Sequence, residues 1–151
     1  MPIALRPALD QDFDYCRRVY FGEMEWIIEE LHLDRSAQQI GFQQSWVPAQ
    51  VRIITLDGAD VGWLQTMMDG DDLFVGQIFV DRPFQRRGIG TEALKRLISE
   101  AAQVDRTVCL AVVKINPARR LYERLGFRVI HEDDRKFYMR RDPDMTMLLS
   151  N

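Results

Sequence analysis

The stretch of sequence that decides the fold comprises residues 80–91, which read Val80-Asp81-Arg82-Pro83-Phe84-Gln85-Arg86-Arg87-Gly88-Ile89-Gly90-Thr91. It follows an apolar run typical of a strand and precedes an amphipathic helix, so its glycines and arginines lie where a helix begins. The first turn of a helix exposes backbone N–H groups without helical partners, and the helix dipole there favours anions. Glycine lets a ligand approach the backbone, and arginine donates hydrogen bonds to phosphate oxygens. The stretch therefore predicts a loop that binds phosphate or pyrophosphate.

The spacing of apolar residues predicts helices and strands on both sides of this loop. Before it we expect a strand at 3–6, a helix capped by Asp10, a helix over 23–33, a shorter helix capped by Asp34, and strands at 51–56, 61–68 and 73–80. After it we expect an amphipathic helix from Ile89, a strand at 107–113, a helix that Asn116-Pro117 begins and Gly126 ends, and strands at 127–131 and 136–140. Asp57-Gly58 and Asp69-Gly70 predict tight turns, so the strands at 51–80 form an antiparallel meander.

These elements predict a single-domain α+β fold. The order strand, helix, strand around Ile89 implies one right-handed parallel crossover within a mixed, mostly antiparallel sheet. We expect six to seven strands flanked by about four helices over residues 1–151, with the core at about 3–141 and a loosely held tail at 142–151.

The amino-acid composition and net charge limit which class of protein the chain can belong to. The chain has 151 residues, 46% hydrophobic and 28% charged, as in an ordinary globular domain, and its net charge of −3 favours neither nucleic acid nor a membrane surface. No apolar stretch is long enough to span a membrane, and the N-terminus lacks a signal-peptide pattern, so we expect a cytoplasmic protein. The two histidines are isolated, which predicts no metal site, and Cys16 and Cys109 are expected to be buried thiols.

Several interpretations of the phosphate loop are open from the residues alone. Residues 88–93 match the dinucleotide fingerprint G-x-G-x-x-G/A, but seven residues separate Val80 from Gly88, and the next strand ends in Lys114 rather than an acidic residue. No Gly-Lys-Ser/Thr follows, which excludes the phosphate loop of nucleotide hydrolases. The glycines could also make only a tight turn beside solvated arginines.

Two motifs resemble those of the GNAT superfamily of N-acetyltransferases. Residues 85–90 resemble its Gln/Arg-x-x-Gly-x-Gly/Ala signature, and residues 80–83 are similar to the strand end that precedes it. Residues 116–127 resemble its second motif, Asn-x-x-Ala/x-x-x-Tyr-x-x-x-Gly-Phe, and the order of elements from Ile3 to about Arg141 also fits.

The resemblance implies a site for acetyl-CoA. The backbone N–H groups that would bind its pyrophosphate belong to Arg86, Arg87, Gly88, Ile89, Gly90 and Thr91, with Gln85 shaping the loop. The pantetheine arm would pair with Ile78, Phe79 and Val80, in a split from the strand at 107–113 that a bulge at Gly76 would help to open. Asn116 would hydrogen-bond this arm, cap its helix, or both, and Arg119 would reach the coenzyme phosphates.

The resemblance also assigns Tyr122 to the catalytic step. A phenol, with a pKa near ~10, can donate a proton to the departing thiolate, although an aromatic packing role is the alternative. The general base is less defined. Many members of the family that the chain resembles carry a glutamate on the strand that leads into this loop, whereas the strand at 73–80 has Gln77 as its only polar side chain. Water at Gln77, or a glutamate among Glu23, Glu25, Glu29 and Glu30, could serve, although each glutamate could equally be a solvated surface charge.

The same resemblance places the acceptor between the first helices and the final hairpin. Aromatic and apolar residues there are Tyr20, Met24, Trp26, Phe42, Trp63, Phe137 and Tyr138. Trp26 interrupts the apolar stripe of its helix, so we expect it to project into a cleft. The residues expected to contact the substrate are Trp26, Glu29, Gln77 and Tyr138. An aromatic, acidic mouth suits a small cationic or amphipathic amine, and a peptide acceptor remains open.

These inferences predict an acetyl-CoA-dependent N-acetyltransferase that acts on a primary amine of a small molecule or peptide and releases coenzyme A. The resemblance leaves a homodimer open as the oligomeric state. The alternative is a catalytically silent acyl-CoA-binding regulatory module, which the missing strand glutamate favours and Tyr122 opposes. A nicotinamide-dependent oxidoreductase is a third interpretation.

Overall fold

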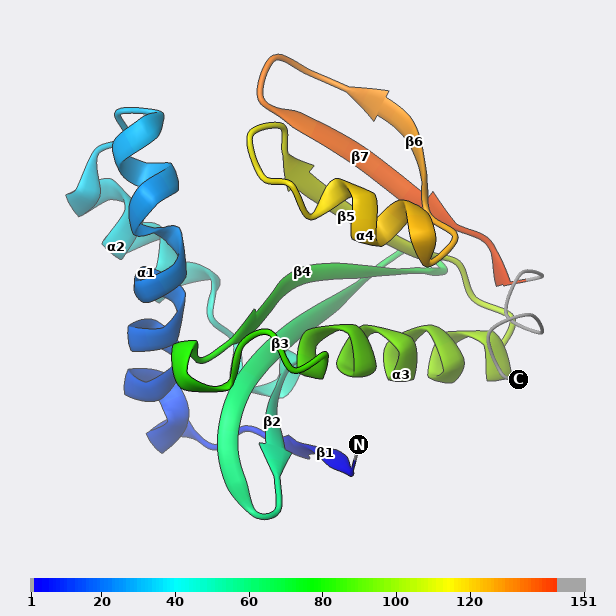
Figure 1. Cartoon of the computed structure of the whole chain (residues 1–151), viewed down its shortest axis with the longest axis horizontal. Coiled ribbons are helices and arrows are strands. Elements are labelled where there is room, and N and C mark those ends of the chain that lie inside the picture. Colours follow the sequence, from blue (N-terminus) through cyan, green and yellow to red (C-terminus); the bar gives the residue numbers. More distant parts are fainter. Residues whose placement is uncertain (1, 144–151) are drawn as a thin grey trace. The chain divides into compact units, whose positions relative to one another are not determined.

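The structure is a computed structural model that describes residues 2–143, so most of the predicted tail at 142–151 lies outside the described residues. Its elements, labelled in Figure 1, are β1 (Ile3–Pro7), η1 (Asp10–Asp12), α1 (Phe13–Glu30), α2 (Arg35–Ser45), η2 (Pro48–Gln50), β2 (Val51–Leu56), β3 (Ala59–Asp69), β4 (Asp72–Val80), η3 (Arg82–Phe84), α3 (Ile89–Gln103), β5 (Val108–Val113), α4 (Arg119–Arg124), β6 (Arg128–Glu132) and β7 (Lys136–Arg141).

The strands form one seven-stranded mixed sheet in the order β1-β2-β3-β4-β5-β7-β6. Within residues 2–143, β4 and β5 are the only neighbouring strands that run parallel, and α3 is the helix that connects them. The predicted α+β class, the meander and the parallel crossover are therefore confirmed. The chain divides into two compact units: the first contains the described residues up to Gln65 together with Gln77–Glu92, and the second contains Thr66–Gly76 and the described residues from Ala93 onward.

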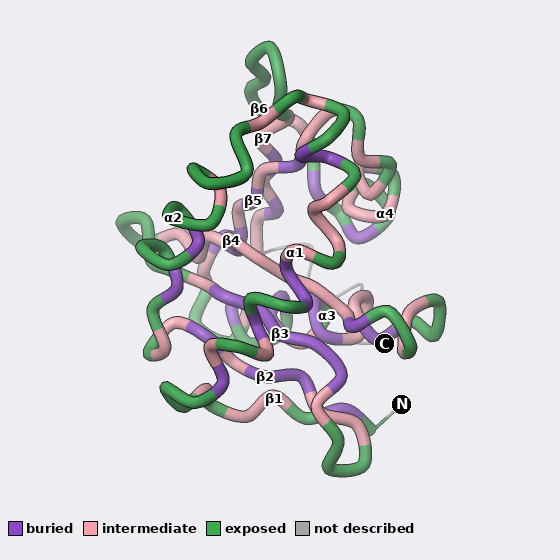
Figure 2. The backbone as a smooth tube through the Cα atoms, turned by 90° about the vertical axis from the view of Figure 1, so that its left-hand side faces the viewer, coloured by how far each residue is buried: buried purple, intermediate pink, exposed green. Residues whose placement is uncertain are grey.

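The first unit is built on a hairpin and two helices. Asp57 and Gly58 have φ values of +53° and +82°, the left-handed pair that a two-residue hairpin turn requires, so the predicted turn between β2 and β3 is confirmed. Ile53, Trp63 and Leu64 are fully buried along these strands, and Figure 2 shows buried backbone running along β2 and β3.

The prediction of two helices over residues 10–33 was wrong. Asp10 begins a short 3-10 turn, and a single helix, α1, then runs from Phe13 to Glu30 through Gly22. The helix continues because Val19, Tyr20, Ile27 and Ile28 keep one buried face across the glycine. The predicted cap of α2 is confirmed, since the Asp34 side chain accepts a hydrogen bond of 3.0 Å from the Ser36 backbone N–H.

The second unit contains β5, β7, β6 and α4, and Figure 1 shows α4 over one face of β5 and β7. Gly126 has a φ of +96° and ends α4 as predicted. The helix begins at Arg119, later than the Asn116-Pro117 start that we expected. The prediction of two buried thiols was half wrong: Cys16 is fully buried, whereas Cys109 is partly exposed because alternate residues of β5 face away from the core.

Candidate functional site

The loop between β4 and α3 contains two residues with left-handed backbone conformation. Arg86 and Gly88 have φ values of +64° and +79°, so left-handed residues stand on both sides of Arg87. Consecutive amides in turns of this type point toward a common centre and bind anions. The first α-helical hydrogen bond of α3 runs from the Glu92 N–H to the Gly88 carbonyl at 3.0 Å, so the amides before Glu92 lie outside the helical ladder.

The side chains around this loop leave it open to solvent and hold its shape. Arg86, Arg87 and Gly88 are exposed, so an anion can reach both the amides and the guanidinium groups. The Gln85 side chain donates a 2.9 Å hydrogen bond to the Val80 carbonyl and thereby joins the two ends of the loop. The Arg87 guanidinium carbon lies 5.7 Å from the centre of the Phe84 ring. These features are those expected of an anion site at the start of a helix.

The strand that leads into the loop pairs with β5 only near its beginning. Leu73–Val75 pair with Val108–Leu110, and Gly76 follows the last paired residue. These three pairs do not include Gly76, so the bulge that we expected there stays a prediction. Ile78, Phe79 and Val80 are half-buried, as is Gln77.

Asn116 and Arg119 belong to the second unit. The Asn116 Oδ1 accepts a hydrogen bond of 2.9 Å from the Ala118 N–H, so its oxygen organises the turn before α4 and its side-chain amide is the donor that is left for a ligand. The Arg119 guanidinium carbon lies 4.3 Å from the Phe137 ring centre, and the Lys114 Nζ lies 5.2 Å from the same centre. Two cationic side chains therefore contact the Phe137 ring. The Arg119 Nε also lies 3.5 Å from a carboxylate oxygen of Glu123.

Tyr122 lies on α4 with its ring against Phe127, at 6.1 Å between ring centres. Burial raises the pKa of the Tyr122 hydroxyl above the usual value for a phenol. The hydroxyl therefore stays protonated at neutral pH and can act as a hydrogen-bond or proton donor, but not as a base.

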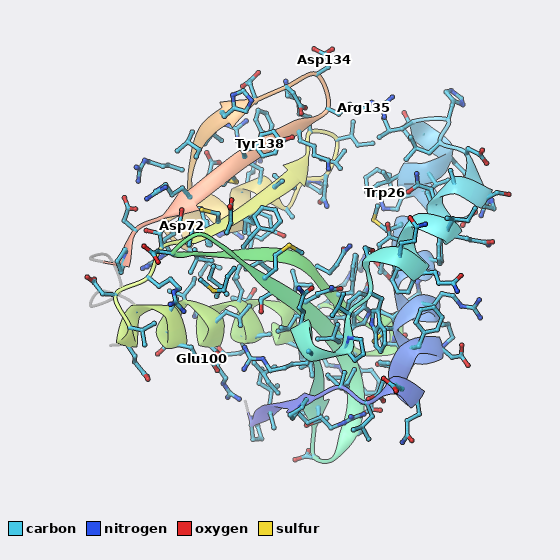
Figure 3. The ribbon with its side chains drawn as sticks, turned by 180° about the vertical axis from the view of Figure 1, so that it is seen from behind. Trp26, Asp72, Glu100, Asp134, Arg135 and Tyr138 are labelled. Atoms are coloured by element: carbon cyan, nitrogen blue, oxygen red, sulfur yellow. The ribbon has the colours of Figure 1, made fainter. Side chains whose placement is uncertain are left out.

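The predicted acceptor residues fall into several environments. Tyr20, Phe42 and Trp63 belong to the buried aromatic core of the first unit and are not free to line a pocket. Their rings pack on one another in edge-to-face and tilted contacts. The ring centres of Tyr20 and Phe42, for example, lie 4.8 Å apart. Trp26 is 46% exposed on α1 and projects from this helix in Figure 3. Met24 packs partly buried against the same core, and Glu29 is exposed.

Two of the candidate glutamates are paired with arginines. Glu25 accepts a 2.6 Å hydrogen bond from Arg35, and this contact lowers the pKa of the Glu25 carboxyl. Glu23 lies 3.9 Å from Arg82. A low pKa makes Glu25 a poorer base. Glu29 lies close enough to this pair to interact with both Glu25 and Arg35, and Glu29 and Glu30 are both exposed.

Tyr138 is engaged within the turn between β6 and β7. Its hydroxyl donates a 2.8 Å hydrogen bond to Asp133, which also accepts from the backbone N–H groups of Arg135 and Lys136. These donors, Tyr138 first, lower the pKa of Asp133 to about 2. Figure 3 shows Asp134 at the tip of this turn, with Arg135 beside it. Asp133 is not among the residues predicted from the sequence, although an aspartate near a chain reversal is a common signal for such a turn.

No group of His, Cys, Asp or Glu suited to hold a metal ion occurs within residues 2–143. Over the same residues, no helix combines the length and the apolar character needed to cross a bilayer.

Comparison with known proteins places these features in a family. Residues 13–127 match the family model described as "Acetyltransferase (GNAT) family". The chain therefore belongs to the GNAT acetyltransferase family. A search of curated protein sequences finds no significant match.

Solved structures share the fold over most of the chain. An acetyltransferase from Thermus thermophilus is 18% identical, with a TM-score of 0.73 over 94% of this chain and 97% of that one. The PaiA N-acetyltransferase of Thermoplasma acidophilum, in complex with coenzyme A, is 16% identical, with a TM-score of 0.67 over 94% and 99%. A GNAT acetyltransferase from Elizabethkingia anophelis with acetyl-CoA bound is 15% identical, with a TM-score of 0.55 over 61% and 74%.

Proposed function

We propose that this protein is an N-acetyltransferase that transfers the acetyl group of acetyl-CoA directly to a primary amine of a small molecule or peptide. The observation that carries the proposal is the anion site of the first unit, in a chain that belongs to an acetyltransferase family. Solved structures with this fold contain coenzyme A or acetyl-CoA, which supports acetyl-CoA as the donor. We also propose a cytoplasmic location, which subcellular fractionation would test.

The residues present fit this coenzyme. The amides of Arg86–Thr91, the left-handed Gly88 and the exposed guanidinium groups of Arg86 and Arg87 suit a diphosphate. The backbone of Ile78, Phe79 and Val80 would bind the pantetheine amides by strand-like hydrogen bonds. The side-chain amide of Asn116 and the guanidinium of Arg119 would add further hydrogen bonds to the coenzyme.

When bound, the coenzyme supplies a thioester whose carbonyl carbon accepts the amine. An amine that binds as the ammonium ion first loses one proton to the base. Its nitrogen then forms the new C–N bond as the C–S bond breaks, a second proton leaves the nitrogen, and one proton reaches the sulfur, so that one proton in total is released to solvent. Tyr122 is protonated at neutral pH and would donate to the sulfur. Gln77 would hold a water molecule that takes the proton from the nitrogen, with Glu29 as the alternative acceptor of that proton.

The acceptor is proposed from the side chains that remain exposed. Trp26 offers an exposed aromatic face and Glu29 an exposed carboxylate on the same helix. An indole and a carboxylate together attract an amine that is cationic before it loses its proton. Tyr138 is retained as an acceptor contact through its ring, because its hydroxyl is engaged by Asp133.

The test compares two substitutions at Gly88. Gly88→Asp and Gly88→Asn introduce side chains of equal size at a φ of +79°, so backbone strain is similar and only the aspartate adds a negative charge. We expect the coenzyme A dissociation constant, measured by calorimetry, to rise at least about tenfold more in Gly88→Asp than in Gly88→Asn. Equal affinities in the two variants would place the coenzyme elsewhere.

A turnover assay distinguishes the proposed N-acetyltransferase from a catalytically silent acyl-CoA-binding module. Purified protein, acetyl-CoA and a panel of amines and peptides are incubated, and the release of free thiol and the mass of the acceptor are followed. We expect acetylated acceptor in proportion to released thiol. Tight binding of coenzyme A without thiol release from any acceptor would favour the regulatory module instead.

A further inference from the structure

Two arginines connect helix α1 to the start of the phosphate loop. One lies on the helix and donates to the loop, and the other lies on the loop and donates to the helix. The Arg18 guanidinium of α1 donates to both carboxylate oxygens of Asp81, at 3.0 and 3.3 Å. Arg82, the next residue of the loop, donates a 2.8 Å hydrogen bond to the Gly22 carbonyl of α1. We call this set, with Glu23 at 3.9 Å from Arg82, the α1–η3 contact. Figure 1 shows the loop beside α1, within the first unit.

Asp81 is the residue through which this contact acts on the loop. It is only 9% exposed, and its backbone N–H donates to the Val61 carbonyl of β3 at 2.8 Å. Its carboxylate also accepts a 2.9 Å hydrogen bond from the Arg82 backbone N–H, which caps η3. Asp81 therefore connects β3, α1 and η3, and a buried carboxylate of this kind needs its cationic partner to remain in place.

The exposed side chain of Arg18 also contacts an aromatic ring of its own helix. Its guanidinium carbon lies 5.3 Å from the centre of the Tyr15 ring, one turn earlier on α1. A guanidinium stacked on an aromatic ring loses less freedom when it forms a two-point ion pair. Arg17, its neighbour in sequence, makes no such link: its contacts are the Phe13 ring at 6.0 Å and Asp14 at 3.8 Å, both within α1.

The backbone between Asp81 and the anion site has little freedom to absorb a shift. The Phe84 N–H donates to the Asp81 carbonyl at 2.9 Å, and the Gln85 N–H donates to the Arg82 carbonyl at 3.3 Å. The left-handed Arg86 follows directly. A displacement of Asp81 is thus passed through a hydrogen-bonded turn to the amides that face the anion, and misplaced amides bind a diphosphate less well.

We propose that Arg18 is a positioning residue for the coenzyme: through Asp81 it sets the orientation of the anion-binding amides. This inference rests on the proposed function. Arg18 lies in sequence far from the loop motif, and neither motif of the family resemblance includes it. Because α1 also carries Trp26 and Glu29, the same contact links the helix of the proposed acceptor residues to the loop of the proposed coenzyme site.

The experiment compares Arg18→Met with Arg17→Met, two substitutions that remove the same charge from adjacent positions of one helix. We measure the dissociation constant for coenzyme A by calorimetry at fixed salt, the Michaelis constants and kcat, and the melting temperature. We expect Arg18→Met to raise the dissociation constant and the acetyl-CoA KM about tenfold, with kcat within about twofold, because a charged hydrogen-bonded pair is lost. Arg17→Met is expected to stay within about twofold of the unaltered protein in every measurement.

Two further variants separate positioning from general stability. Arg18→Lys keeps the charge but not the two-point geometry, and we expect it to recover part of the lost affinity. In an Asp81→Asn background, Arg18→Met is expected to weaken binding little further, because both changes remove one interaction. A lower melting temperature with unchanged coenzyme affinity in Arg18→Met and Arg18→Lys would overturn the inference, as would equal losses in Arg18→Met and Arg17→Met. If the unaltered protein itself binds no coenzyme A, the proposed function fails instead.

Discussion

Tyr122 shows at the scale of one residue how packing and chemistry combine. Its ring packs against Phe127, and burial raises the pKa of its hydroxyl, so the group is a neutral donor over the physiological pH range. Phenylalanine preserves the ring and removes only the donor. The substitution therefore isolates the proposed proton transfer from the packing role that the sequence left open.

We predict that Tyr122→Phe lowers kcat roughly tenfold or more, at or above the low end of what the loss of a general acid costs. The dissociation constant for coenzyme A should change little, and the melting temperature should show that the fold is kept. Steady-state kinetics with the best acceptor from the amine panel measure kcat. An unaltered kcat would return Tyr122 to a packing role.

At position 126, the backbone conformation and the space beside it favour glycine over any other residue. Its φ of +96° strains any L-residue, and a Cβ there would lie 2.9 Å from the Arg141 Nε, which donates to the Leu125 carbonyl at 2.8 Å. We predict that Gly126→Ala lowers the free energy of unfolding by about 2 kcal/mol, from backbone strain and disturbance of this buried hydrogen bond. Urea denaturation gives the value.

The matched control is Gly41→Ala on α2. A Cβ at Gly41 meets nothing within 4 Å, and the position is helical, so alanine should raise the free energy of unfolding by about 0.5–1 kcal/mol. Opposite signs at the two glycines are the expected result. A stabilising Gly126→Ala would show that the backbone there does not need the left-handed conformation.

At the scale of elements, the hairpin of β6 and β7 depends on one carboxylate. Asp133 accepts from two backbone N–H groups and from the Tyr138 hydroxyl, and its pKa falls to about 2. This value lies below the ~3.9 of an unfolded aspartate, so the ionised form stabilises the folded hairpin. That stabilisation is fully present above about pH 4 and is lost as the pH falls through about 2.

We predict that Tyr138→Phe raises the pKa of Asp133 toward its unfolded value, because the largest contribution to the shift is removed. Titration of the Asp133 carboxyl carbon by NMR measures it directly. Tyr122→Phe, whose ring contacts Phe127 and not the hairpin turn, serves as the control and should leave the Asp133 midpoint in place. An Asp133 midpoint that is equal in the unaltered protein and in Tyr138→Phe would contradict the role of the phenol.

For the whole molecule, the two units are continuous through shared elements. β3, β4 and α3 each contain residues of both units, so three continuous elements belong to both. We predict that the chain unfolds in urea as one cooperative transition. The three tryptophans, Trp26, Trp46 and Trp63, all belong to the first unit, so their fluorescence reports on that unit while far-UV circular dichroism reports on both. Separate midpoints for the two signals would show that the units unfold independently.

Much of the fold could be predicted because its signals are local. Asp57-Gly58 specified its hairpin turn, the Asp34 cap specified the start of α2, and the apolar stripe from Ile89 specified α3. The boundary between helices near Gly22 was predicted wrongly, because a glycine is locally unfavourable in a helix but the buried face on both sides of it outweighs that cost. Likewise, residue spacing could not show that Tyr20, Phe42 and Trp63 pack on one another.

The amino-acid sequence by itself determined the order of the strands along the chain, the helix from Ile89 and the family, since these depend on residue types at short separations along the chain. Only the tertiary structure decided that Asp81 is held by Arg18, that Tyr138 is engaged by Asp133, and which candidate glutamates are paired. The physical reason is that ion pairs and hydrogen bonds between side chains depend on distances of about 3 Å, and those distances are set by how whole elements pack.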